Sequence, residues 1–204
     1  MRSIEVSGLL LQPLAKRIRG WLADGKLDEN DLEQALSSNA RAFIDHEVAR
    51  EDWAMLADVE GLVGLIADQL GGEPGIVEWA SEVVEEWLVE SPIEQLLRSA
   101  RRLADAPGFV VSQASERLVR DGRWCYEGGG ERFMVRLSGI AETSAPFKAL
   151  VGGTLARLAE RAGASAFDVR FDGIDGDELV IFGELECGDR SLAESRLQRA
   201  ALIP

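Results

Sequence analysis

The spacing of apolar residues changes near residue 107, and this change constrains the fold more than any other feature. Before it, apolar side chains recur three or four residues apart, as at Leu10, Leu14 and Ile18, which is typical of amphipathic helices. After it, short runs such as RFMVRLSG (132–139) alternate apolar and polar residues beside glycine-rich turns, which is typical of strands. We therefore predict a helical region over 1–106 and a sheet-containing region over 107–204.

The sequence pattern of the second region predicts elements in the order strand, strand, helix, strand, strand. A hairpin is expected around GGGE (128–131), then a helix from Ala145–Pro146, then strands in AFDVRFDG (166–173) and DELVIFGEL (177–185). A short closing helix is expected within 185–204. Helices separated in sequence from a small antiparallel sheet indicate an α+β fold. We expect the two regions to form one integrated unit, an all-helical N-terminal half packed on a ββαββ sheet.

The helix expected over 147–163 has small residues on one face. Its large face, which we expect on the sheet, holds Phe147, Leu150, Val151, Thr154, Leu155, Leu158 and Ala162. Its other face holds Ala149, Gly152, Gly153 and Ala156, although each interior glycine costs a helix about 1 kcal/mol relative to alanine. Three explanations are open: close packing by an N-terminal helix or a partner subunit, a kink, and close approach of a ligand.

The charge of the chain excludes some classes of partner. Its formal net charge is −14 over 204 residues, which disfavours binding to nucleic acid and to anionic lipid. No stretch approaches the roughly 20 apolar residues of a membrane span. Cys125 and Cys187 are too few for a disulfide framework, so we predict a cytoplasmic protein with reduced thiols.

No motif in the sequence predicts catalysis or a bound metal. His46 is the only histidine, and its acidic neighbours Asp45 and Glu47 would point to different helix faces. The turn DGIDGDE (172–178) lacks the ligand spacing of a calcium loop, and the glycines at 128–130 do not begin a helix that could hold a phosphate. We therefore expect no catalytic residues, no metal site and no cofactor.

Five tryptophans are many for a chain of this length. Those at 53, 79 and 87 are expected in helices and in the core. Trp21 and Trp124 are candidates for a partner surface, since exposed aromatic residues anchor interfaces.

Two segments resemble a known ligand-binding fold. These are RFMVRLSGIAETSAPFKALVGGTLARLAERAG (132–163) and DVRFDGIDGDELVIFGE (168–184). After a helical N-terminal half, they resemble the fold shared by vinyl-reductase-type domains, TRAPP trafficking subunits and haem nitric-oxide sensors. The glycines at 152 and 153 are similar to the glycine-containing helix of the vinyl-reductase type, and Gly176, Asp177 and Phe182 resemble its last strand.

The chain departs from these families at their functional residues. Vinyl-reductase-type domains carry cysteines around the last two strands, where this chain has acidic and aliphatic residues. The haem sensors imply an axial histidine and a Tyr-x-Ser-x-Arg set, whereas His46 lies in the other half and Tyr126 is followed by EGGGER. Arg50 and Trp53, at the start of a middle helix, also resemble a paralogous family of myxobacteria over 50–184, which implies a bacterial protein.

The sequence therefore favours a non-catalytic regulatory or scaffold protein that binds a protein partner and forms a homodimer. The alternative is a sensor that holds a small apolar ligand between the helical half and the sheet. An enzyme ranks last.

Overall fold

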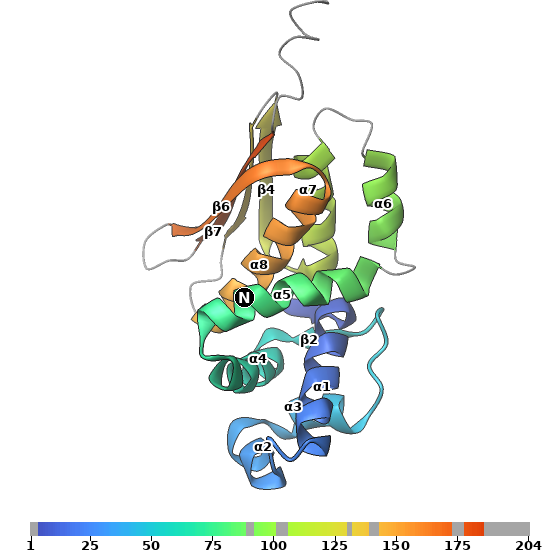
Figure 1. Ribbon diagram of the computed structural model, residues 1–204, viewed down its shortest axis with the longest axis vertical. Coiled ribbons are helices and arrows are strands. Elements are labelled where there is room, and N and C mark those ends of the chain that lie inside the picture. Colours follow the sequence, from blue (N-terminus) through green and yellow to red (C-terminus); the bar gives the residue numbers. More distant parts are fainter. Residues whose placement is uncertain are drawn as a thin grey trace, which may run out of the picture.

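The computed structural model describes residues 4–88, 92–100, 106–129, 132–138, 143–172 and 178–185 (Figure 1). The helices of the N-terminal half are α1 (Gly8–Ala23), α2 (Glu29–Ala35), α3 (Ser38–Asp45), α4 (Leu56–Leu70), α5 (Glu73–Leu88) and α6 (Pro92–Ala100). The C-terminal part contains α7 (Ala106–Leu118), β4 (Arg123–Gly129), β5 (Arg132–Ser138), α8 (Ala145–Arg161), β6 (Ala164–Asp172) and β7 (Glu178–Leu185). The predicted α+β class is confirmed, and the closing helix expected within 185–204 falls almost wholly outside the described residues.

The helices begin and end where side chains or glycine satisfy the terminal backbone groups. Asp28 caps α2 in a reciprocal capping box with Asp31, and Ser144 caps α8 by accepting from the Phe147 amide. Gly71, with a φ of 82°, ends α4 in the left-handed conformation that favours glycine.

The C-terminal strands form a four-stranded antiparallel sheet in the order β4-β5-β7-β6. The expected hairpin is confirmed, because β4 and β5 pair in register from Arg123 opposite Ser138 to Gly129 opposite Arg132. Central β7 then pairs with β5 on one side and with β6 on the other. The helix α8 begins at Ala145, as predicted.

Three short strands form a second sheet that the sequence did not predict. They are β1 (Glu5–Ser7), β2 (Trp53–Met55) and β3 (Val119–Arg120), in the order β2-β1-β3. The expectation of an all-helical N-terminal half is wrong in this detail, because strands of two or three residues are too short to show alternation. Trp53 was expected in a helix and instead lies in β2.

The helix α7 was also missed. It begins at Ala106–Pro107, within a DAPG sequence that reads as a turn, so the helical part of the chain extends beyond residue 106 to Leu118. Proline is favoured in the first turn of a helix, where its missing N–H has no intrahelical partner. The same residues therefore mark a helix start.

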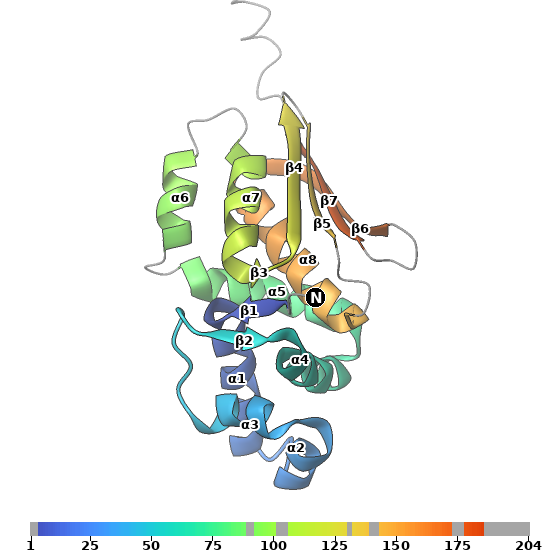
Figure 2. The same cartoon turned by 180° about the vertical axis from the view of Figure 1, so that it is seen from behind.

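Helices cover one face of the larger sheet (Figures 1 and 2). The helix α7 packs on β4 and β5, and α8 packs on β6 and β7. On its other side α8 contacts α5 and α4, so it lies between the helical half and the sheet. One hydrophobic core runs through both regions. Among the described helices, none has the length and apolarity that a membrane crossing needs.

Candidate functional site

The small-residue face of α8 lies against α5. A Cβ atom at Gly153 would be 3.1 Å from the Cβ atom of Ala80 and 3.2 Å from the Cα atom of Val77. Gly152 is buried, and Ala149 and Ala156 are only 5% and 4% exposed. The two helices therefore approach closely where α8 lacks large side chains. That these small residues also contact a partner subunit stays a prediction.

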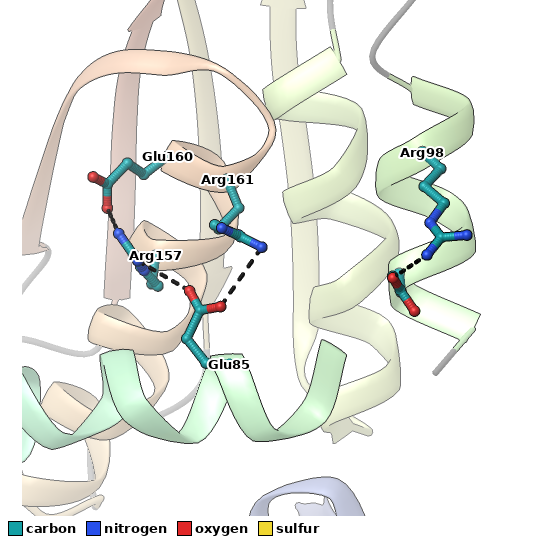
Figure 3. Close-up of polar contacts among 6 residues, drawn as sticks. Glu85, Arg98, Arg157, Glu160 and Arg161 are labelled. Carbon is teal, nitrogen blue, oxygen red and sulfur yellow. Dashed lines mark hydrogen bonds and ion pairs between the residues drawn. The ribbon is translucent and has the colours of Figure 1, made fainter. Parts of the chain in front are cut away.

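Polar side chains of the helical half contact α8 near both of its ends. At the N-terminal end, the Glu60 carboxylate of α4 accepts a hydrogen bond from the Ser144 amide. At the other end, Glu85 of α5 lies 3.0 Å from Arg157 and 3.6 Å from Arg161 (Figure 3). The hydrogen bond to Glu160 raises the pKa of Arg157, burial opposes this rise, and the hydrogen bond to Glu85 adds to it. Arg157 therefore stays charged. Between these two polar ends, the middle of α8 makes apolar contacts.

Thr154 is a polar residue in that apolar middle. It is fully buried, and its Oγ1 atom has no hydrogen-bond partner among the described residues. It shares a face of α8 with Phe147, Leu150 and Leu158, each at most 1% exposed. A buried hydroxyl without a partner costs about 1–3 kcal/mol. Sequence reasoning placed Thr154 on this face and missed its importance, because the pattern does not show whether a hydroxyl finds a partner.

Aromatic rings fill the contact between α7 and the sheet. A Cβ atom at Gly128 would overlap the hydroxyl of Tyr126, and a Cβ atom at Gly183 would overlap the ring of Phe133. At Gly108 of α7, an added Cβ would lie 2.5 Å from the hydroxyl oxygen of Tyr126. Gly128 thus leaves room for the Tyr126 side chain, and this packing accounts for the glycine without a bound phosphate.

The two tryptophan candidates lie on different elements, Trp21 in α1 and Trp124 in β4. Trp21 of α1 is 7% exposed, and the guanidinium of Arg17 lies 5.3 Å from its ring centroid. It lines an open hollow of about 260 Å³ between α1 and α5, with Trp79 and Glu82. Trp124 of β4 is half-buried and donates a hydrogen bond of 3.0 Å to the Val119 carbonyl. The partner role of both residues stays a prediction.

The residues present do not fit a haem group. His46 is exposed and directly follows α3, which lies in the half of the molecule away from the larger sheet (Figure 1). Tyr126 packs against α7 instead of beginning a Tyr-x-Ser-x-Arg set. Cys125 is exposed. Within the described part of the chain, no three His, Cys, Asp or Glu residues are grouped to hold a metal ion.

Comparison with known proteins gives structural matches alone. No protein-family model matches the chain, and no curated protein sequence matches it either. An Fe(II) unliganded H-NOX protein from K. algicida, as an alanine-to-glycine mutant, superposes with a TM-score of 0.55 at 9% identity, over 92% of this chain and 99% of that chain. The H-NOX protein without that mutation matches with a TM-score of 0.54 at 9% identity, over 87% of this chain and 95% of that chain.

A double mutant of Tt H-NOX matches with a TM-score of 0.53 at 11% identity, over 88% of this chain and 95% of that chain. Of the families that the sequence resembles, the haem nitric-oxide sensors are thus supported at the level of structure. The likeness to vinyl-reductase-type domains, TRAPP subunits and the myxobacterial family stays a prediction. At such low identity the matches establish architecture alone: the chain has the fold of H-NOX domains over nearly its whole length.

Proposed function

We propose that this protein is a sensor domain that binds a small, mostly apolar ligand beside Thr154, without haem. The ligand would lie where α8 joins the helical half to the sheet. The H-NOX-like fold supports this hypothesis over the scaffold hypothesis, which rests on composition. The proposal includes no catalysis.

The observation that carries the proposal is the buried hydroxyl of Thr154. Among the described residues its Oγ1 atom has no hydrogen-bond partner, and its neighbours on the same face of α8 are apolar. A ligand with one polar atom would satisfy this hydroxyl, and its apolar remainder would replace contacts among the surrounding aliphatic side chains. The energy that the unpaired hydroxyl costs the free protein would then favour the bound state.

Binding at this position requires the interior to open. Phe147, Leu150 and Leu158 are packed in the structure, so the site would form as the ligand enters. Such sites are minor conformations that a ligand makes dominant. The polar contacts of Glu60 and Glu85 hold the ends of α8, so the opening would be local to its middle.

The test is native mass spectrometry of the freshly purified full chain and of the Thr154→Val variant, which keeps the side-chain shape and removes the hydroxyl. We expect the unmodified chain to retain a small non-covalent mass and the variant to lose it. The Thr154→Ser variant, which keeps a hydroxyl, should retain it. A bare chain, or equal retention by Thr154→Val, would contradict the proposal.

A titration with hemin separates this proposal from a haem sensor. We expect no Soret band shift, because His46 is exposed and distant from the junction around α8. A stoichiometric shift that His46→Ala abolishes would show that the chain binds haem after all.

A further inference from the structure

The strand β4 forms an edge of the larger sheet among the described strands. It pairs with β5 on one side, and no described strand pairs with its other side. Proteins usually protect such edges with proline, lysine or a bulge. The β4 sequence RWCYEGG contains neither proline nor lysine, and its pairing with β5 is regular over all its residues. The opposite edge differs, because β6 has an irregularity between Ala164 and Ala166.

The side chains of β4 are accessible on both faces of the sheet. Alternate residues point to opposite faces, so Arg123, Cys125 and Glu127 share the face away from α7, and all three are exposed. Trp124 and Tyr126 share the face toward α7. Tyr126 is 37% exposed although it packs on Gly108. Aromatic surface of the edge strand itself is therefore accessible.

We infer that β4 pairs with β4 of a second copy of this chain, in an antiparallel arrangement centred on Cys125. A two-fold axis at this residue places Arg123 opposite the partner's Glu127, and Trp124 opposite the partner's Tyr126. Each of these pairs occurs twice, and Cys125 faces the partner's Cys125. Opposite-charge and aromatic pairs are the cross-strand pairs that stabilise sheets.

Neighbouring registers lack this complementarity. A two-fold axis at Tyr126 would place Arg123 opposite the partner's Gly129 and Trp124 opposite the partner's Gly128. An axis at Trp124 would place Arg123 opposite the partner's Cys125. Among the described residues, neither Arg123 nor Glu127 forms an ion pair within its own chain. The register centred on Cys125 gives both of them an oppositely charged partner.

The resulting dimer is isologous, since the same strand contributes from both chains. It joins the two sheets into one continuous sheet and places both α7 helices on the same side. This inference is independent of the proposed ligand, because it uses no residue of the α8 junction.

Sedimentation equilibrium of the full chain tests the pairing through a charge swap. We expect a dimer of twice the 22.2 kDa chain mass. Arg123→Glu or Glu127→Arg alone should raise the dimer Kd about tenfold or more, because two attractive pairs become repulsive. The double variant Arg123→Glu/Glu127→Arg should restore dimerisation.

The matched control reverses an exposed ion pair elsewhere. Lys16 and Glu86 lie 2.9 Å apart on α1 and α5, and Lys16→Glu/Glu86→Arg should leave the dimer Kd unchanged. A monomer at every concentration, or single β4 variants that behave like the control, would overturn the inference.

Cysteine cross-linking tests the register itself. Directly opposed residues in antiparallel strands have Cα atoms about 4.5–5.5 Å apart, within the range that a disulfide spans. In a Cys187→Ser background, diamide should remove two electrons and two protons from the two Cys125 thiols and give a covalent dimer. A chain with Cys125→Ser and Gly20→Cys, which moves the thiol to α1, should stay monomeric on a non-reducing gel. Equal cross-linking of the two chains would overturn the register.

Discussion

At Gly153 the helices α5 and α8 approach closely because a side chain is missing. Its neighbours across the contact are the Cβ atom of Ala80 and the backbone of Val77, neither of which can rotate away. Gly20 of α1 is a useful contrast, since an added Cβ would meet nothing within 4 Å there. The same residue type thus has opposite roles in two helices.

We predict opposite effects of alanine at these two glycines. Gly20→Ala should raise the free energy of unfolding by about 0.5–1 kcal/mol, because alanine favours the helix and nothing is displaced. Gly153→Ala should not raise the free energy of unfolding, because the added Cβ meets α5. Gly153→Leu should lower the free energy of unfolding by more than about 2 kcal/mol through overpacking against α5. Urea unfolding measures all three. Equal stabilisation by alanine at both positions would show that α5 and α8 are not in close contact.

At the scale of elements, α8 is held in place by apolar packing along its length and by polar contacts near its ends. Glu85 lies within ion-pair distance of two arginines of α8, and its side chain is 43% exposed. Ion pairs with this exposure contribute up to about 1 kcal/mol. The apolar contact around Gly153 therefore carries most of the attachment.

Glu85→Gln should lower the free energy of unfolding by no more than about 1 kcal/mol, with a smaller difference in 1 M salt, where surface charges are screened. The control is Glu86→Gln on the same helix, whose partner Lys16 is 68% exposed, and it should change stability by less than about 0.3 kcal/mol. Chemical denaturation at two salt concentrations measures both. A Glu85→Gln loss that does not fall with salt would contradict the assignment to charge.

The elements predicted from sequence were those with long, clear periodicity. The four strands of the larger sheet and α8 follow from alternation, glycine-rich turns and the Ser144–Pro146 start. The strands β1, β2 and β3 could not be predicted, because two or three residues carry no period and their pairing is tertiary. The helix α7 was not predicted, because its proline suits a turn as well as the start of a helix. Trp53 was assigned to a helix because the three-residue strand β2 shows no alternation.

The candidate site was less predictable than the fold. The small face of α8 is visible in the sequence, but what covers it depends on how α5 crosses it. Thr154 carries the proposal because its hydroxyl has no hydrogen-bond partner in the part of the chain that the structure describes, which is a property of the three-dimensional surroundings. The glycines that accommodate Tyr126 and Phe133 come from α7, β4 and β7, so no local motif unites them.

At the scale of the whole molecule, the chain combines an H-NOX fold with an interior that does not suit haem. The core is continuous from the helical half to the sheet, and the space between α7 and the sheet is occupied by the chain's own aromatic rings. The fold places α8 between the two parts, so a ligand beside Thr154 would contact the element that joins them.

A crystal structure of the protein as purified tests this claim most directly. We expect electron density for a small molecule without iron, with one polar atom about 2.7–3.2 Å from the Thr154 hydroxyl oxygen. Thr154 bonded to the carbonyl of Leu150, with no density between α8 and its neighbours, would contradict it.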